Sequence, residues 1–269
     1  MKEYKNKKIL IFGGSGFLGR NLINRLDEFD YEIIVFSQKK FLEKKFFKYY
    51  PKKNLKIVSW SLDNIQSIEN HFLKVEAVIN LCGILYENKR GDFYRVHSDL
   101  PSILGKMSSK QNVRNLIHIS ALGVSENSKS KYSSSKASGE RRLLENFPNA
   151  KILRPSLLFG HGDNFFGQFS QMASISPVLP LISRSTKFQP ISVIDVATGI
   201  INLLIGKRKK NALYELGGRS IYSFEELLKM LLEVKNIKRI FLPLNSKLMK
   251  IPAFFLQKLP RPPFTVDQM

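Results

Sequence analysis

The sequence predicts an α/β fold built on a doubly wound parallel sheet, and three observations lead to this class. Short apolar runs alternate with stretches of helical periodicity along most of the 269 residues, as expected for a parallel sheet with helices on both faces. A glycine-rich turn, GGSGFLG at 13–19, directly follows the first apolar run. Tyr132 and Lys136 are four residues apart in a predicted helix, so their side chains share one face.

Each expected strand is a short apolar run of the kind that a sheet buried on both faces requires. The expected strands are 8–12, 32–36, 55–58, 77–81, 115–119, 151–153 and 212–216. The helical patterns between them cover 17–26, 64–73, 100–110, 132–145 and 193–204. The first strand, helix and second strand together have the length of a βαβ unit.

The texture of the chain changes after Arg154-Pro155. We expect residues 1–155 to form a nucleotide-binding core of the Rossmann type. Residues 156–269 would mostly build a small substrate-side lobe, with 191–216 rejoining the core. The Phe-, Ser-, Pro- and Gly-rich stretch 156–190 predicts irregular structure.

The chain is strongly basic, with 43 Lys and Arg against 22 Asp and Glu and a net charge of +21. Such a charge favours anionic partners: a phosphorylated cofactor, an anionic membrane surface or an acidic protein. Compositional drift would also explain it, because the lysines are spread along the chain. The sequence contains no RNA-binding aromatic signature, zinc finger or helix-turn-helix pattern, so we expect no nucleic acid ligand.

Cysteine and histidine usage indicates neither disulfides nor metal sites. Cys82 is the single cysteine, which suits a reducing compartment. His71, His97 and His161 lack metal-ligand spacing, and His118 is expected in a strand. No apolar run is long enough to span a bilayer. We therefore expect a cytoplasmic protein, either free or peripheral on the inner face of the membrane.

The glycine turn predicts dinucleotide binding. Gly13 permits the tight exit from the strand, Gly16 lets the backbone approach a pyrophosphate, and Gly19 allows the helix to pack closely on the sheet. The following helix presents free N–H groups to the phosphates. Ser15, Phe17 and Leu18 complete the expected contacts of the turn. The alternative is a structural turn that has lost its ligand.

The end of the second strand indicates which dinucleotide binds. NAD-binding units usually place an Asp or Glu there for the ribose 2′-hydroxyl. Here the chain reads Ser37-Gln38-Lys39-Lys40, with two lysines and no acid. We expect Ser37, Lys39 and Lys40 to contact the cofactor, which favours NADP(H) over NAD(H). The alternative is a pair of ordinary surface lysines.

Ser120, Tyr132 and Lys136 form the candidate catalytic set. Ser120 ends a predicted strand, and the other two lie on the helix that follows. An ammonium beside a phenol favours the phenolate, which makes the pair a plausible acid/base device. The alternative is a strand-ending serine followed by a Ser-rich helix cap at 133–135.

At this point the chain resembles the extended branch of the short-chain dehydrogenase/reductase superfamily, of the NAD-dependent epimerase/dehydratase type. The shared motifs are GGSGFLG at 13–19, NLCG at 80–83, Tyr-x-x-x-Lys at 132–136, LRPSLLFG at 153–160 and YELGG at 214–218. The resemblance implies that Tyr132 is the general acid/base, with Lys136 on the nicotinamide ribose and Ser120 on the substrate oxygen. It also implies cofactor contacts from Leu81, Cys82, Gly83, Pro155, Leu157 and Leu158.

Longer blocks, including YSSSKASGE, FQPISVIDVA and PPFTVDQ, resemble the family of the alpha-subcomplex nine accessory subunit of respiratory complex I. This resemblance implies an NADP(H)-binding protein associated with a membrane respiratory complex or with quinone or lipid metabolism. The resemblance also implies a structural role for the nucleotide. The alternative is an active NAD(P)-dependent oxidoreductase or epimerase/dehydratase on a small substrate. The chain departs from the superfamily at Val96-His97, where Val-Asn is common.

Overall fold

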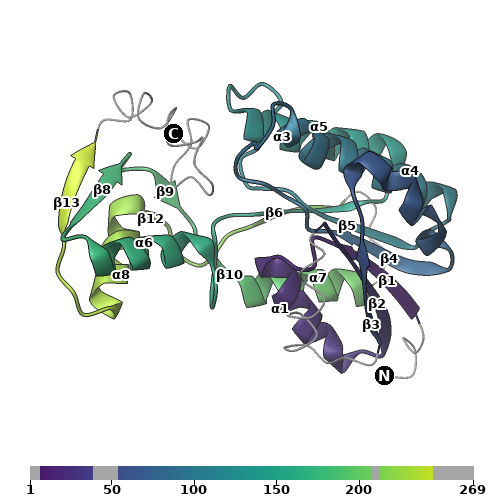
Figure 1. Cartoon of the computed structure of the whole chain (residues 1–269), viewed down its shortest axis with the longest axis horizontal. Coiled ribbons are helices and arrows are strands. Elements are labelled where there is room, and N and C mark those ends of the chain that lie inside the picture. Colours follow the sequence, from purple (N-terminus) through teal and green to yellow (C-terminus); the bar gives the residue numbers. More distant parts are fainter. Residues whose placement is uncertain (1–6, 39–53, 207–211, 245–269) are drawn as a thin grey trace. The chain divides into compact units, whose positions relative to one another are not determined.

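The computed structural model describes residues 7–38, 54–206 and 212–244. The chain divides into two compact units (Figure 1): Met1–Pro155 with Val193–Leu216, and Ser156–Ser192 with Gly217–Met269. Each unit is described by itself below.

The first unit contains a seven-stranded sheet in the order β11-β6-β5-β4-β1-β2-β3, and all of its neighbouring strands are parallel. The strands are β1 (Lys7–Phe12), β2 (Tyr31–Ser37), β3 (Leu55–Ser59), β4 (Val75–Asn80), β5 (Asn115–Ile119), β6 (Lys151–Pro155) and β11 (Ala212–Leu216). The prediction of a doubly wound parallel sheet is therefore confirmed.

Helices cover both faces of this sheet (Figure 1). One face carries α1 (Phe17–Arg25) and α7 (Val193–Ile205). The other carries α3 (Asp92–Tyr94), the π-helical turn η4 (Arg95–Asp99), α4 (Leu100–Lys110) and α5 (Lys131–Asn146). Short 3-10 segments, η2 (Leu26–Glu28) and η3 (Leu62–Phe72), complete the unit.

The core of the first unit explains why the strands are apolar throughout. Ile9, Leu10, Ile11 and Phe12 of β1 are all fully buried, as expected for a central strand covered on both sides. Phe12 stacks on Phe36 of β2, with ring centres 4.5 Å apart. This packing holds β1, which precedes the glycine turn, against β2, which ends at Ser37.

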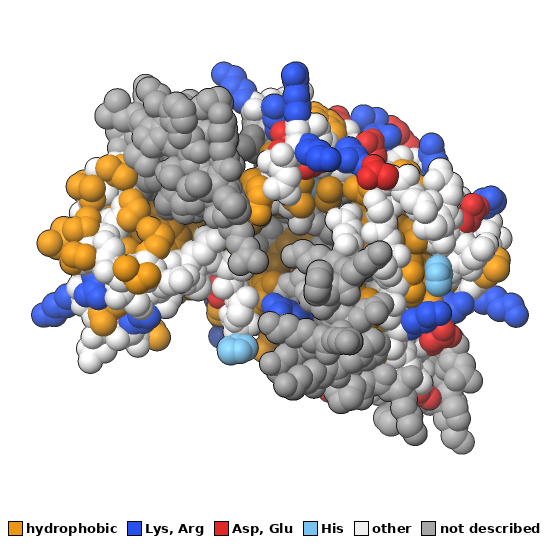
Figure 2. All heavy atoms as spheres, in the orientation of Figure 1, with side chains coloured by type: hydrophobic (Ala, Val, Ile, Leu, Met, Phe, Trp, Pro, Cys, Tyr) orange, Lys and Arg blue, Asp and Glu red, His pale blue; other side chains and the backbone are white. Residues whose placement is uncertain are grey.

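The second unit is a smaller α/β assembly. Its elements are β7 (Leu158–Phe159), α6 (Asn164–Ile175), β8 (Val178–Ile182), β9 (Lys187–Phe188), β10 (Ile191–Ser192), β12 (Tyr222–Ser223), α8 (Phe224–Val234) and β13 (Ile240–Leu244). Phe169 of α6 and Leu228 of α8 lie in its core. Apolar side chains also lie on its surface over β8 and β13 (Figure 2), including the exposed Ile240 and Leu242.

Two local predictions were wrong. The stretch 156–190 is not irregular, because α6 occupies Asn164–Ile175, with Asp163 accepting a bond from the Phe166 N–H as its N-cap. The expected helix at 64–73 is instead 3-10 structure over Leu62–Phe72, interrupted by non-helical φ/ψ at Asn64. Within the described ranges, no helix is both long and apolar enough to cross a bilayer.

Candidate functional site

The candidate site lies where the chain reverses its direction across the sheet. From β1 the chain proceeds through β2 to β3 on one side, and from β4 through β5, β6 and β11 on the other. In open parallel sheets, ligands bind beyond the carboxyl ends of the strands at such a switch point. The glycine turn follows β1, and the segment Leu81–Gly83 follows β4.

The glycine turn forms a cradle that side chains would fill. Gly13 has φ +76°, and a Cβ there would lie 2.9 Å from the carbonyl carbon of Leu81. The Gly16 N–H donates to the Gly13 carbonyl at 3.0 Å, and Gly16 is the N-cap of α1 with no side-chain cap. Backbone N–H groups at such a helix start can receive phosphate oxygens. The turn therefore fits a pyrophosphate group.

The other predicted residues of this turn take part in its packing. Leu18 and Gly19 are buried at the start of α1, and a Cβ on Gly19 would overlap the backbone of Gly14. Phe17 is the first residue of the helix. Gly19 is therefore required for the close approach of α1 to the turn.

The end of β2 lies beside the turn. Ser37 is buried, and its Oγ is 3.4 Å from Ser15 Oγ. Gln38 follows as an exposed residue. Lys39 and Lys40, the expected contacts for a 2′-phosphate, lie outside the described residues.

Hydrogen bonds fix the segment after β4. The Leu81 N–H donates to the Phe12 carbonyl at 2.9 Å. The Cys82 N–H donates to Asn80 Oδ1 at 3.1 Å, and Asn80 Nδ2 lies 3.1 Å from His118 Nδ1. Burial raises the pKa of the Cys82 thiol to about 12, so Cys82 stays protonated at neutral pH.

Lys136 brings α5 to this segment. Its side chain is buried, with 5% of its surface exposed. Its Nζ donates to the Ile119 carbonyl at 3.3 Å and lies 3.6 Å from a Cβ placed on Gly83. Burial lowers the pKa of Lys136 to about 8, with Glu140 acting in the opposite direction. Lys136 is therefore a buried cation at neutral pH.

Ser120 and Tyr132 both precede Lys136 in the chain, and both belong to segments near its side chain. Ser120 follows β5, and its backbone N–H donates to the Leu153 carbonyl. Its Oγ is buried and has no hydrogen-bond partner among the described residues, although buried hydroxyls normally have one. The ring centre of Tyr132 is 5.8 Å from Lys136 Nζ. The fold thus brings Lys136 near both the Ser120 strand end and the Tyr132 ring.

The beginning of α5 differs from the expected Ser-rich cap at 133–135. The N-cap is Ser130, whose side chain accepts a bond from the Ser133 N–H. Ser133 Oγ instead accepts from the Ser125 N–H at 3.0 Å. These bonds tie the loop before α5 to the helix turn that carries Tyr132.

The remaining predicted cofactor residues are divided between the two structural units. Pro155 ends β6 in the first unit. Leu157 and Leu158 belong to the second unit, where Leu158 begins β7.

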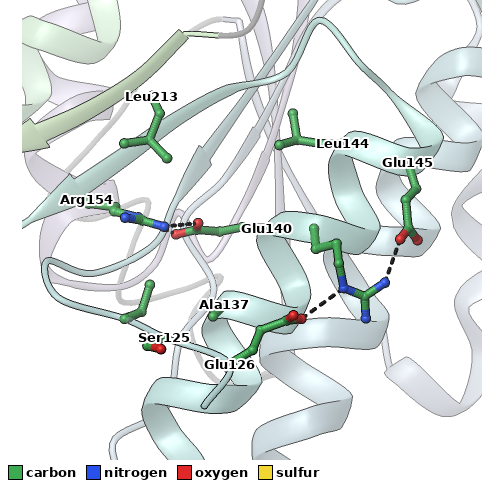
Figure 3. Close-up of a pocket in the computed structure, with 10 residues that line it drawn as sticks. Ser125, Glu126, Ala137, Glu140, Leu144, Glu145, Arg154 and Leu213 are labelled. Carbon is green, nitrogen blue, oxygen red and sulfur yellow. Dashed lines mark hydrogen bonds and ion pairs between the residues drawn. The ribbon is translucent and has the colours of Figure 1, made fainter. Parts of the chain in front are cut away.

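A separate pocket in the first unit lies along α5 (Figure 3). It is lined by Val124, Ser125, Glu126, Ala137, Glu140, Arg141, Leu144, Glu145, Arg154 and Leu213. Arg154 pairs with Glu140 at 2.6 Å and with Glu215 at 3.3 Å. Tyr132, Lys136 and Ser120 are not part of its lining. This pocket is distinct from the candidate site.

The sequence did not predict the roles of two buried histidines near the site. His97 contacts the Tyr132 ring edge-on, with centres 5.3 Å apart, and His118 bonds Asn80. Burial, with Lys136 adding to it, lowers the pKa of each histidine to about 3. The only sequence signal was Val96-His97 in place of the common Val-Asn, because single histidines have no informative spacing.

Relatives of the chain include proteins named as subunits of a mitochondrial NADH dehydrogenase [ubiquinone]. It is 29% identical to the NADH dehydrogenase [ubiquinone] 1 alpha subcomplex subunit 9 of Dictyostelium discoideum, over 96% of this chain and 73% of that protein. The mouse protein of the same name is 30% identical, over 87% of this chain and 62% of its own length. A ceramide reductase of Caulobacter vibrioides is 26% identical, over 72% of this chain and 59% of its own length. The chain thus spans only about three fifths to three quarters of these relatives' lengths.

Solved structures share the fold at low identity. A dTDP-glucose 4,6-dehydratase of Bacillus anthracis, in complex with NAD, matches 97% of this chain and 93% of its own, with a TM-score of 0.74 and 18% identity. The model of the family described as NAD dependent epimerase/dehydratase matches residues 9–211. Together with the sheet order and the glycine turn, this match shows that the chain belongs to the NAD dependent epimerase/dehydratase family.

Proposed function

We propose that the chain binds a nicotinamide dinucleotide, prefers NADP(H), and serves as a nucleotide-holding partner of a membrane respiratory complex. The observation that carries the proposal is the position of Lys136, buried with its Nζ beside Gly83 at the switch point of the sheet. A buried cation is unfavourable without compensation, and a nucleotide bound at this edge would supply hydrogen-bond acceptors. The buried hydroxyl of Ser120, which lacks a partner within the described ranges, supports the same reading.

Different segments of the chain would bind different parts of the nucleotide. The 13–19 turn would receive the pyrophosphate, Leu81–Gly83 would line the adenosine side, and Lys136 would bond the nicotinamide ribose. A nucleotide bound in this way could accept or donate hydride. Tyr132 would hold the proton of a carbonyl or hydroxyl at its phenolic oxygen, and Ser120 would bond the same substrate oxygen.

The preference for NADP(H) is supported by the end of β2. Ser37 is the last residue of β2 and Gln38 follows it, and neither is a carboxylate that would repel a 2′-phosphate. Lys39 and Lys40 follow in the sequence and can supply cations.

Titration of four nucleotides tests this preference. We expect NADPH and NADP⁺ to bind more tightly than NADH and NAD⁺. The double variant Lys39→Ala/Lys40→Ala should raise the Kd of NADPH about tenfold, the equivalent of ~1.4 kcal/mol, and leave that of NADH unchanged. Lys106→Ala/Lys110→Ala, on α4, is the control for loss of two charges. Equal losses for NADPH and NADH would contradict the 2′-phosphate assignment.

The respiratory partner is supported by the names of the relatives and by the net charge of +21. Opposite charge on a partner surface accelerates association and selects the partner. Purification of a tagged chain from its native membranes in mild detergent tests this role. We expect respiratory subunits to elute with the chain, together with nucleotide that does not exchange. Elution of the chain alone would contradict it.

An active enzyme is the second candidate. It is favoured by the unpartnered Ser120 hydroxyl among the described residues and by the relative named as a ceramide reductase. The substrate would carry a carbonyl or hydroxyl on a small, lipid-derived or quinone-like molecule. Tyr132→Phe should then abolish turnover while nucleotide binding is retained. Turnover that survives this substitution would exclude Tyr132 as the acid/base.

A further inference from the structure

His97 joins two parts of the candidate site that are distant in sequence. It lies on the π-helical turn η4, and only 1% of its surface is exposed. Its Nε2 accepts a hydrogen bond from the Ile84 N–H at 3.0 Å. Its Nδ1 lies 3.0 Å from Ser135 Oγ on α5. Both ring nitrogens are therefore engaged, one with each part.

The direction of every bond in this chain follows from chemistry. Because a backbone N–H can only donate, Nε2 must be the unprotonated nitrogen of His97. The neutral ring then carries its proton on Nδ1 and donates it to Ser135 Oγ. The Ser135 hydroxyl in turn donates to the Tyr132 carbonyl at 3.0 Å. An oriented chain of three bonds thus runs from Ile84 through His97 and Ser135 to the backbone of Tyr132.

The neutral form that this chain requires agrees with the surroundings of the ring. His97 is buried close to Lys136, and Gly83 lies between them: a Cβ on Gly83 would be 3.9 Å from His97 Nε2 and 3.6 Å from Lys136 Nζ. A second positive charge here would be repelled by the Lys136 ammonium. Burial, with Lys136 and His118 adding to it, lowers the pKa of His97 to about 3.

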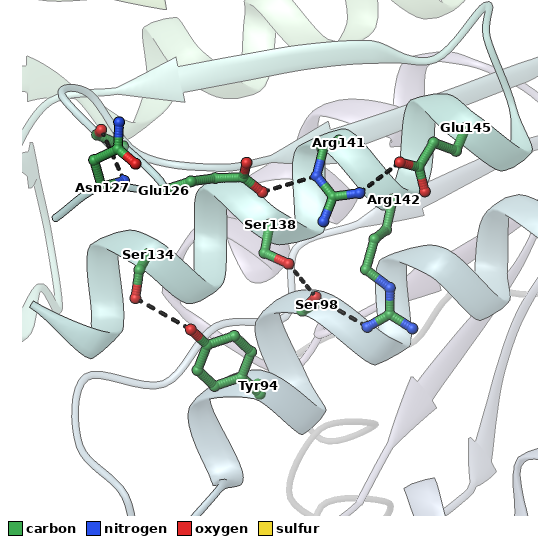
Figure 4. Close-up of polar contacts among 10 residues, drawn as sticks. Tyr94, Ser98, Glu126, Asn127, Ser134, Ser138, Arg141, Arg142 and Glu145 are labelled. Atoms are coloured by element: carbon green, nitrogen blue, oxygen red, sulfur yellow. Dashed lines mark hydrogen bonds and ion pairs between the residues drawn. The ribbon is translucent and has the colours of Figure 1, made fainter.

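The same ring also packs against the candidate acid/base. Phe93 stacks on His97 at 5.4 Å, and both rings meet the Tyr132 ring edge-on. Further polar contacts join α3 and η4 to α5 (Figure 4): Tyr94 with Ser134, and Ser98 with Ser138. Those contacts fasten the helices to each other, whereas His97 is also bonded to the segment after β4.

We propose that His97 is a positioning residue, which holds the Leu81–Ile84 segment and the Tyr132 turn of α5 in register through this oriented hydrogen-bond chain. The significance for nucleotide binding rests on the proposed function, because both parts are assigned there to the cofactor and its reacting group. The hydrogen-bond chain itself does not depend on a ligand.

The imidazole tautomer of His97 tests the direction of the hydrogen bonds directly. Long-range ¹H–¹⁵N spectra of the nucleotide-free protein at pH 7 should show His97 neutral and protonated on Nδ1. His118 is the internal contrast: its Nδ1 accepts from Asn80 Nδ2, so its proton must be on Nε2. An Nε2-protonated or doubly protonated His97 would overturn the proposal.

Amide hydrogen exchange tests whether the hydrogen-bond chain couples the Ile84 backbone to α5. Ser135→Ala removes the bond to His97 from the helix side and does not touch Ile84. We expect it to accelerate exchange of the Ile84 amide at least fivefold, and His97→Phe, which keeps a ring but neither bond, to accelerate it further. The matched control is Ser134→Ala, because Ser134 Oγ contacts Tyr94 and not His97. Unchanged Ile84 exchange in Ser135→Ala would overturn the proposal, even if His97→Phe fails to fold.

The affinity for NADPH shows whether the hydrogen-bond chain supports nucleotide binding. Ser135→Ala and His97→Phe should each raise the Kd of NADPH, and the double variant should raise it no further than the more severe single variant. Independent, additive effects would overturn the proposal. If the wild-type chain binds no dinucleotide, the proposed function fails, whereas the tautomer and exchange measurements still decide the role of His97.

Discussion

Lys136 is the residue on which the candidate site depends most, because its charged side chain is buried in the free protein. Burial lowers its pKa from 10.5 to about 8, which means that the folded state disfavours the ammonium. Residues arranged for function often reduce stability in this way. The stability of the protein can therefore reveal the strain without any knowledge of a substrate.

Lys136→Met should stabilise the nucleotide-free protein at pH 7, by up to about 3 kcal/mol at ~1.4 kcal/mol per unit of pKa. The lowered pKa means that the folded protein binds fewer protons than the unfolded chain between pH 8 and 10.5. Wild-type stability therefore rises with pH in this window, and the advantage of the variant is complete below pH 8 and shrinks above it. Denaturant unfolding at pH 7 and pH 10 measures the difference.

The control for this prediction is Lys106→Met, which replaces an exposed lysine on α4. It should change the free energy of unfolding by less than about 0.5 kcal/mol. A Lys136→Met variant less stable than wild type at pH 7 would show that the buried ammonium stabilises the fold.

Among the elements, α5 and η4 define the geometry of the site by their close approach. A Cβ on Gly139 of α5 would overlap the carbonyl oxygen of His97. The π-helical turn thus fits against a helix position that has no side chain. Such turns occur frequently at functional sites, and this one places His97 between α5 and the segment after β4.

Gly139→Ala should destabilise the first unit by about 3 kcal/mol or more, because two backbones must separate to admit the methyl group. Gly199→Ala is the matched control on α7, where a Cβ would meet no atom within 4 Å. That substitution should be neutral or stabilise by up to ~1 kcal/mol through helix propensity. Thermal unfolding of both variants checks the pair, and equal stabilities would contradict the observed packing.

The elements that the sequence predicted well are those with a strong period. The strands Asn115–Ile119 and Ala212–Leu216 and the helix Leu100–Lys110 have the predicted bounds. The helix Asn164–Ile175 has apolar residues at helical spacing, Phe165, Phe169, Met172 and Ala173, but the Phe-, Ser-, Pro- and Gly-rich composition around it favoured an irregular segment. Apolar spacing does not distinguish an α-helix from 3-10 structure, so the pattern at 64–73 predicts an α-helix where the chain forms 3-10 structure over Leu62–Phe72.

Only part of the candidate site was predictable from the sequence. The glycine turn and the Tyr132–Lys136 spacing are local signals, so the sequence contained them. The chain through Ile84, His97 and Ser135 depends on which segments meet in space, and no local pattern encodes this. The π-helical turn that carries His97 also gives no periodic signal.

At the scale of the whole molecule, the family and the candidate site agree on nucleotide binding. The matched family region, residues 9–211, contains the glycine turn, Ser120, Tyr132 and Lys136. The chain covers only part of the length of the NADH dehydrogenase [ubiquinone] subunits that it matches. Nucleotide binding is therefore the part of the proposed function to test first, and association with a respiratory partner is the second.

The identity of the nucleotide that co-purifies with the chain decides whether the chain holds NADP(H). The protein is purified from its native source without added cofactor and denatured, and the released small molecules are identified and quantified by mass spectrometry. We expect NADPH or NADP⁺, near one per chain, and its loss in Gly16→Val, because a side chain there would fill the pyrophosphate cradle. NAD(H) in its place would contradict the assigned preference. A preparation with neither bound nucleotide nor measurable affinity for one would contradict the proposal that the chain binds a nicotinamide dinucleotide.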